Sequence, residues 1–116
     1  MPRKEMPIFT RTFDLLLWLV RVSKHFPSIY RHTVTQRFLN ASFELRERLE
    51  EANIRKGKAR LERLERADEA LQQVRFYLRF VTQLGWLSEG QYHHAAKMVT
   101  EIGKLLGGWR KSIHRT

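Results

Sequence analysis

Apolar side chains recur at steps of three and four along most of the chain, and this spacing constrains the fold more than any other feature of the sequence. Such steps place residues on one face of an α-helix. An average period of about 3.5 residues is typical of helices that pack at shallow angles in a bundle. The most regular series consists of Tyr92, Ala95, Val99, Ile102, Leu106, Trp109 and Ile113.

Helix-breaking and helix-capping residues divide this pattern into four segments. Proline occurs only at positions 2, 7 and 27, so no proline ring interrupts a helix after residue 27. Gly57 marks a break, and Ser88 with Gln91 forms a capping-box pattern ahead of the last segment. The pattern therefore predicts a flexible N-terminus over residues 1–8, a bundle over residues 9–113 and a C-terminal tail over residues 114–116. The helices are expected over residues 9–26, 28–54, 58–85 and 88–113.

Signals for β-strands are missing from the sequence, which has no long alternation of β-branched residues and no Asn-Gly or Asp-Gly turn. The connections between the predicted helices are short, so neighbouring helices should run antiparallel. The sequence therefore predicts an all-α protein, an antiparallel up-down four-helix bundle.

Some predicted helices carry more apolar surface than one bundle needs. The first is apolar on most sides between residues 15 and 20, and the third adds Phe76, Tyr77 and Phe80 beside its core face. These side chains are either the margins of a wide core or a subunit interface, since a helix that is apolar on most sides must be covered.

Positive charge dominates the chain, with 22 lysines and arginines against 12 acidic residues and a net charge of +10. Residues 38–71 hold eight basic and eight acidic side chains, which predicts a surface of ion pairs. Residues 1–37 and 72–116 each hold seven basic and two acidic side chains. An excess of this size attracts polyanions, so a polyanionic partner should meet the two outer segments.

Six basic residues of the last two helices are the candidate nucleic-acid-binding residues. The lysines among them, Lys97, Lys104 and Lys111, are spaced by seven and form one line. Arg75 and Arg79 of the third helix lie one turn apart beside aromatic residues. For a single lysine a solvated helix face is the alternative, but no acidic residue follows Glu101 to balance the line. The set favours contacts with phosphates, and arginine beside aromatic rings permits stacking on unpaired bases. The candidates are Arg75, Arg79, Lys97, Lys104, Arg110 and Lys111.

Other function classes find little support. Cysteine is absent, which excludes disulfides and thiolate metal sites and suits a reducing cytoplasm. The longest apolar run has six residues, far fewer than the roughly 20 of a membrane span. Glu89 and His93 are four apart, but no His-Glu-x-x-His motif accompanies them. The sequence predicts no enzyme, no metal and no cofactor.

Three segments resemble the Avd proteins, the accessory variability determinants of diversity-generating retroelements. Val74-Arg75-Phe76-Tyr77-Leu78-Arg79-Phe80 and Glu101-Ile102-Gly103-Lys104-Leu105-Leu106-Gly107-Gly108-Trp109 are similar to the two signature segments of that family. Phe26-Pro27, followed by Tyr30-Arg31-x-Thr33 and Gln36-Arg37, resembles its first helical connection. The chain departs from many relatives at Ser28, where they have lysine, and at Thr35, where they have glycine.

The resemblance implies a homopentameric barrel of four-helix bundles with a positively charged surface. It also implies a cytoplasmic, bacterial or phage-encoded accessory protein that binds a reverse transcriptase and RNA or DNA during mutagenic retrohoming, without a membrane partner. Carried over to this chain, Arg75, Arg79 and Lys104 would contact nucleic acid or polymerase. The positions expected to serve packing are Phe76, Phe80, Gly103, Gly107 and Trp109.

Two other kinds of helical protein are alternatives to this interpretation. A ribosome-associated bundle protein of the kind encoded in rRNA intervening sequences would share the same architecture. A helical ribonuclease of the HEPN type is disfavoured because Arg21-x-x-x-His25 and Arg110-x-x-x-His114 are each one residue shorter than that family's arginine-to-histidine spacing.

Overall fold

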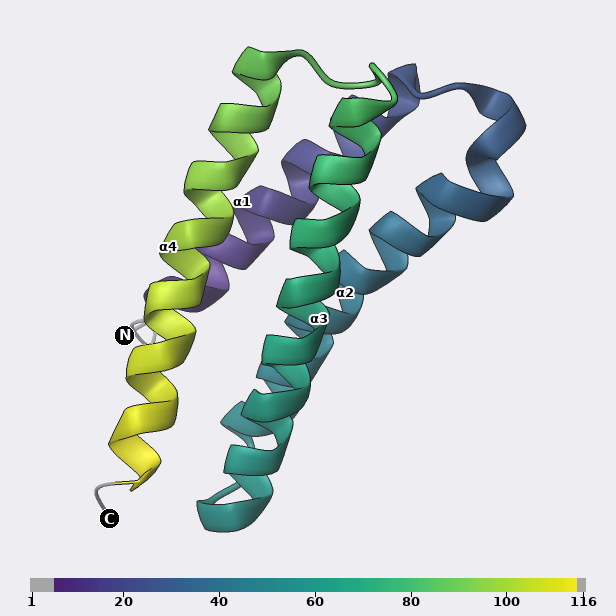
Figure 1. Cartoon of the computed structure of the whole chain (residues 1–116). Helices are drawn as coiled ribbons and strands as arrows, with labels where there is room; N and C mark the ends of the chain where they lie inside the picture. The colour runs from purple at the N-terminus through teal and green to yellow at the C-terminus, as the bar shows by residue number, and fades with distance from the viewer. Residues whose placement is uncertain (1–5, 115–116) are drawn as a thin grey trace, which may run out of the picture.

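The apolar spacing forms four α-helices in the computed structural model of the chain, which describes residues 6–114 (Figure 1). These residues contain no β-strand. The bundle is elongated, with extents of 47 × 28 × 23 Å. The helices are α1 (Pro7–Val22), α2 (Gln36–Asn53), α3 (Gly57–Gln83) and α4 (Glu89–His114).

Consecutive helices run antiparallel, and α4 returns to lie against α1, which confirms the predicted up-down bundle (Figure 1). The contacts follow this direction. Phe9 near the start of α1 meets Trp109 near the end of α4, with ring centroids 6.1 Å apart. Further along α1, Trp18 meets His94 near the start of α4 at 5.4 Å. Across the described residues, no helix combines the length and apolarity needed to cross a lipid bilayer.

The predicted helical stripes form the core. On α3 the apolar residues that recur at steps of three and four are buried from Leu64 to Val81, and Leu61 ahead of them is half-buried. The buried positions are Leu64, Ala67, Leu71, Val74, Leu78 and Val81. On α4 the middle of the stripe is buried, whereas Tyr92, Trp109 and Ile113 at its two ends are half-buried because fewer neighbours surround the ends of the bundle. The largest fully buried aliphatic side chains include Leu45, Leu49, Leu64, Leu71, Ile102 and Leu106.

The first helix begins earlier than residue 9 and ends earlier than residue 26, because α1 stops at Val22 and a 3₁₀ helix, Ser23–His25, follows it. Pro7 occupies the first turn, where its missing N–H leaves no hydrogen bond unmade, and Ile8 is only 2 % exposed. Residues 7 and 8 therefore belong to the bundle and not to a flexible N-terminus. Residues 1–5, and residues 115 and 116 of the predicted tail, lie outside the described residues.

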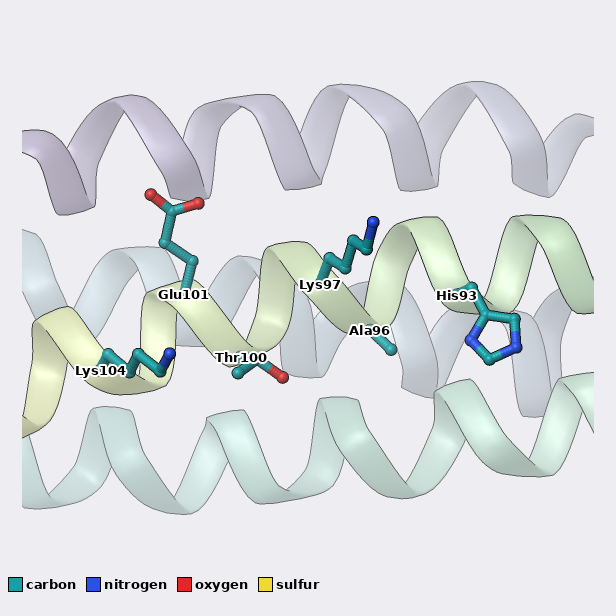
Figure 2. Close-up of a pocket in the computed structure, with 6 residues that line it drawn as sticks. All are labelled: His93, Ala96, Lys97, Thr100, Glu101 and Lys104. Atoms are coloured by element: carbon teal, nitrogen blue, oxygen red, sulfur yellow. The ribbon is translucent and has the colours of Figure 1, made fainter.

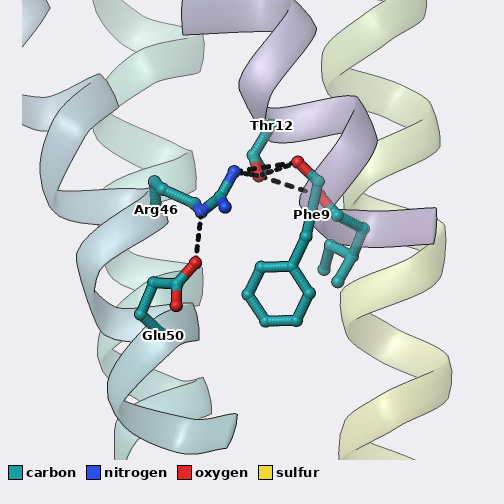
Figure 3. Close-up of polar contacts among 5 residues, drawn as sticks. Phe9, Thr12, Arg46 and Glu50 are labelled. Atoms are coloured by element: carbon teal, nitrogen blue, oxygen red, sulfur yellow. Dashed lines mark hydrogen bonds and ion pairs between the residues drawn. The ribbon is translucent and has the colours of Figure 1, made fainter. Parts of the chain in front are cut away.

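A half-buried polar contact holds the start of α1 against α2 (Figure 3). Arg46 of α2 donates from Nη1 to the carbonyl oxygen of Phe9 at 2.9 Å and to Oγ1 of Thr12 at 3.4 Å. Its Nε pairs with Glu50 at 2.8 Å, and its guanidinium carbon lies 5.1 Å from the centre of the Phe9 ring. One arginine therefore links the two helices through both hydrogen bonds and ring packing.

The predicted continuous helix over residues 28–54 is wrong in its first turns. A 3₁₀ helix, Ser28–Tyr30, and a π-helix, Arg31–Thr35, precede α2. Tyr30 leaves helical geometry with φ −102° and ψ 13°, and its ring stacks on Trp86 at 5.4 Å. This contact with Trp86 in the α3–α4 connection holds Tyr30 in place. The helical spacing of the sequence does not predict the contact.

The remaining connections follow the sequence signals closely. Gly57 and Gly85 have φ values of +58° and +82°, the left-handed region that glycine adopts without strain. Ser88 and Gln91 form the predicted capping box: the Ser88 N–H donates to Gln91 Oε1 at 2.9 Å, and the Gln91 N–H donates to Ser88 Oγ at 3.1 Å. Helix α4 thus begins where the sequence indicates.

Candidate nucleic-acid interface

The outer face of α4 carries the predicted line of lysines. Lys97, Lys104 and Lys111 are all exposed, because the helix turns Ala95, Val99, Ile102 and Leu106 toward the core. The middle of this face forms an open depression of about 570 Å³. Figure 2 shows it between α1 and α3, with Lys97 and Glu101 extending toward α1 and Thr100 on the side of α3. Its lining residues are His93, Ala96, Lys97, Thr100, Glu101 and Lys104.

The one carboxylate of this depression is already paired. Glu101 Oε1 lies 2.8 Å from Nε of Arg11 on α1. None of the three lysines forms an ion pair with any residue that the structure describes. A row of ammonium groups without counter-charges raises the local potential, and this attracts an anion.

Arg75 and Arg79 of α3 extend the same surface. They line a smaller groove of about 190 Å³ between α3 and α4. Ala96 and Thr100 line both this groove and the α4 depression. The fold therefore brings two arginines of α3 and two lysines of α4 onto one continuous surface. We call Arg75, Arg79, Lys97 and Lys104, with the two hollows that they line, the basic surface.

Gly103 makes room for Arg75. A Cβ atom built on Gly103 would lie 2.7 Å from Nη2 of Arg75 and 3.6 Å from Leu71 Cδ2. The Arg75 guanidinium therefore lies directly over the glycine, and its Nε is buried without a hydrogen-bond partner. Gly107 has no neighbour within 4 Å of such a Cβ, so the expected packing role holds for Gly103 and not for Gly107.

Arg110 and Lys111 lie closer to the end of α4. Arg110 is half-buried, and its Nη1 is 3.7 Å from Oδ2 of Asp68 on α3. Its charge is partly balanced within the bundle, which sets it apart from the lysine line. Lys111 is exposed and continues the line beyond the depression.

Two exposed phenylalanines lie next to the basic surface. Phe76 and Phe80 are 49 % and 41 % exposed, so they are not packed as the resemblance led us to expect. Their rings stack on each other with centroids 5.7 Å apart and an interplanar angle of 19°. A single chain leaves these rings uncovered because they lie on the outer side of α3.

Arg37 joins this aromatic pair; the sequence places it in a segment that resembles the Avd family but not among the candidate binding residues. It lines a hollow of about 260 Å³ together with Thr33, Val34, Phe76, Tyr77 and Phe80. Spacing along the chain shows only which residues share a helix face. It does not show that Arg37, near the start of α2, faces the aromatic residues of α3. No signal in the sequence therefore points to this pairing.

Exposed apolar side chains also lie on α1 and α2. Phe13 and Phe43 are 58 % and 43 % exposed, and Leu17 and Val20 are 40 % and 41 % exposed. Trp18, by contrast, is half-buried against His94. The bundle thus covers only part of the apolar segment 15–20.

Groups of three or more histidine, aspartate or glutamate side chains that could hold a metal ion are absent from the described part of the chain. Arg21 and His25 are exposed at the end of α1. The side chain of His114, on which the second ribonuclease-like spacing depends, lies outside the described residues.

Comparison with solved structures shows the fold. The chain is similar to a protein of unknown function from the S23 ribosomal protein family of Bacteroides thetaiotaomicron, whose crystal structure extends to 1.70 Å resolution. The TM-score is 0.81 and the identity 16 %, over 90 % of this chain and 95 % of that one. No curated protein sequence matches the chain.

Comparison with protein families shows to which family the chain belongs. A family model described as bAvd-like matches residues 6–113, which include all four helices of the bundle and the three segments that resemble Avd proteins. The chain therefore belongs to the bAvd-like family.

Proposed function

We propose that this chain is a non-catalytic accessory protein that binds nucleic acid and associates with the reverse transcriptase of a diversity-generating retroelement. The observation that carries the proposal is the basic surface, on which Arg75, Arg79, Lys97 and Lys104 lie together without an ion-pair partner among the described residues. Membership of the bAvd-like family supports the link to a retroelement.

The ligand that best fits this surface is a single-stranded nucleic acid. Lysine and arginine side chains contact phosphates whatever the base sequence. The exposed rings of Phe76 and Phe80, with Arg79 on their own helix and Arg37 in the same hollow, offer flat surfaces on which unpaired bases stack. Bases of a duplex are already stacked, so they gain little from these rings. We expect affinity with weak sequence preference.

In this proposal the protein works as a homo-oligomer. Its resemblance to Avd proteins implies a pentamer. Exposed apolar side chains lie on α1 at Phe13, Leu17 and Val20 and on α2 at Phe43, and we propose that neighbouring subunits cover them. Several copies would multiply the number of basic surfaces that one strand can reach, which raises its overall affinity.

Replacing Arg75 and Arg79 together with alanine tests the binding role. We expect fluorescence anisotropy to show weaker binding of a single-stranded RNA, with the circular dichroism of a folded bundle retained. The control is Lys56→Gln with Lys58→Gln, which removes two charges from exposed side chains at the α2–α3 connection. Equal affinity of the wild type and the arginine variant at two salt concentrations would remove the two arginines from the interface.

Co-purification with the reverse transcriptase encoded beside the gene tests the partner. Complex formation that survives nuclease treatment indicates a direct protein contact, and loss after nuclease indicates a bridge of nucleic acid. No complex under either condition contradicts the accessory role.

A ribosomal role is the second candidate, and the similarity to a member of the S23 ribosomal protein family favours it. Co-sedimentation with ribosomes at moderate salt would support this candidate. A neighbouring reverse transcriptase gene with near-identical variable and template repeats would instead support the retroelement.

A further inference from the structure

The connection between α1 and α2 forms a pocket that the proposed function does not use. Its volume is about 330 Å³, roughly ten times the ~30 Å³ that one water molecule occupies in the liquid. Phe26 and Leu39 contribute apolar wall, and no carboxylate lines the pocket. The polar lining residues are Ser23, Lys24, Ser28, Arg31 and Thr35.

Two of these side chains bring positive charge without a counter-charge. Lys24 and Arg31 come from different segments of the connection, the 3₁₀ turn that follows α1 and the π-helix that precedes α2. Neither forms an ion pair with a described residue. Two cations that line one hollow repel each other unless an anion lies between them.

Thr35 supplies an independent observation. It is 7 % exposed, and its Oγ1 is buried without a hydrogen-bond partner. Two other helical threonines of this chain donate to the carbonyl four residues earlier: Thr12 bonds to Ile8 at 2.8 Å and Thr82 bonds to Leu78 at 2.7 Å. Thr35 ends the π-helix, a form of helix found often at functional sites. A buried hydroxyl without a partner carries a desolvation penalty, which a ligand oxygen removes by accepting its hydrogen bond.

We propose that this pocket binds a phosphate group. Lys24 and Arg31 supply two positive charges for a phosphate dianion, and the hydroxyl of Ser28 donates a hydrogen bond to one of its oxygens. The hydroxyl of Thr35, whose oxygen is covered without a ligand, joins them when its side chain rotates toward the pocket. Ser23 is not part of this set, because its hydroxyl already donates to the Val20 carbonyl at 2.9 Å. The phosphate comes either from the end of a nucleic-acid chain or from free inorganic phosphate.

The pocket is separate from the basic surface. Its residues lie between positions 23 and 39, and it shares none with the hollows lined by α3 and α4. Nucleic acid can therefore bind to the basic surface whether or not the pocket holds phosphate, and loss of one kind of binding leaves the other measurable.

Thermal unfolding with increasing inorganic phosphate, at constant ionic strength in chloride, tests the site. We expect the midpoint of the wild type and of the Lys56→Gln, Lys58→Gln control to rise with phosphate and then saturate. Arg31→Gln should bind phosphate roughly tenfold more weakly, because it loses a hydrogen bond between charged groups. A rise of equal size in Arg31→Gln and the wild type would overturn the proposal.

Thr35→Val provides a second readout that does not depend on charge. Valine has nearly the same shape but no hydroxyl, so the variant should unfold at a higher temperature than the wild type without phosphate and gain less from adding it. A lower midpoint without phosphate, together with a full phosphate response, would show that the hydroxyl is satisfied within the protein and would contradict the site.

Two oligonucleotides distinguish the sources of phosphate. A short RNA with a 5′ phosphate should bind more tightly than the same RNA with a 5′ hydroxyl, and Arg31→Gln should abolish the difference, if the pocket takes a chain end. Equal binding of the two RNAs by the wild type, together with a saturable response to inorganic phosphate, would assign the pocket to the free ion. If the wild type responds neither to the two RNAs nor to inorganic phosphate, the proposal is overturned.

Discussion

At the scale of single residues, small changes of side chain decide what the basic surface presents. Arg75 lies where α3 faces α4, and the absence of a side chain at Gly103 lets the Nη2 end of its guanidinium approach the helix closely. Arg110, only seven residues from Gly103, pairs with Asp68 of α3, and this half-exposed pair balances part of its charge. Two arginines of similar appearance in the sequence thus have different surroundings.

Gly103→Ala separates the binding role of Arg75 from the stability of the bundle. The new methyl group would meet Nη2 of Arg75 at 2.7 Å, and this flexible end can move away. Alanine favours a helix over glycine by about 1 kcal/mol, so we expect unchanged or slightly higher stability in urea unfolding but altered RNA affinity. A loss of more than about 1 kcal/mol would show instead that the glycine is needed for helix packing.

Trp109→Ala should destabilise the bundle by about 2–3 kcal/mol, less than the 3–5 kcal/mol expected for a fully buried tryptophan. The ring is half-buried, meets Phe9 edge-on at 6.1 Å and lies under the guanidinium of Arg60 at 5.8 Å. Chemical denaturation measures the loss. The control is Ile54→Ala, where the side chain is 81 % exposed and the change should stay within about 0.5 kcal/mol.

At the scale of elements, the helices differ in how charged and apolar residues are distributed over their faces. Helix α2 and the first half of α3 hold ion pairs, such as Arg63 with Glu51 and Arg66 with Glu69, as the equal counts of basic and acidic residues over 38–71 predict. Helix α4 turns an apolar stripe inward and an unpaired line of lysines outward. The charge of α4 is therefore available to a partner, whereas much of that on α2 and α3 is already paired.

The capping box makes a prediction for the start of α4. Ser88→Ala removes the acceptor of the Gln91 N–H, and we expect a loss of about 1 kcal/mol in unfolding free energy. Gln91→Ala removes the reciprocal bond, and the double variant should lose less than the sum of the two because they form one unit. Strict additivity in urea titrations would argue against a coupled box.

The lysine line makes a prediction for salt dependence. Replacing Lys97, Lys104 and Lys111 with glutamine removes three potential phosphate contacts. The slope of log K against log salt for single-stranded RNA should then fall by about 2, at roughly 0.7 per contact. Anisotropy titrations at several salt concentrations measure the slope, and an unchanged value would place the lysines outside the interface.

At the scale of the whole molecule, the two sides of the bundle differ in chemistry. The side formed by α3 and α4 is basic with an aromatic margin, and the side of α1 and α2 exposes phenylalanine and aliphatic side chains. This arrangement suits an oligomer that covers its apolar side and presents its basic side to nucleic acid.

Phe13→Glu combined with Phe43→Glu should reduce the mass measured by light scattering to that of a single chain, because charged groups oppose burial of this surface. Both side chains are well exposed, so the bundle itself should keep its helical content. RNA affinity should fall as well, since a single chain loses multivalent contact. A wild-type protein that is already a monomer at micromolar concentration would contradict the proposed assembly.

The sequence alone determined the features that depend on neighbours along the chain. The stripe of α4, the breaks at Gly57 and Gly85 and the capping box of Ser88 all follow from local geometry, because 3.6 residues per turn and the φ preferences of each residue act within a few positions. The same rule put Lys97 and Lys104 on one exposed line.

Only the tertiary structure decided what meets across helices. It placed Arg37 beside Phe76, stacked Tyr30 on Trp86 and thereby broke the predicted long helix, and paired Arg110 with Asp68. Helical period fixes the angle of a residue about its own axis, but not the rotation and axial offset of one helix against another. Packing of the whole core sets those two quantities, so the contacts they create cannot be obtained from spacing alone.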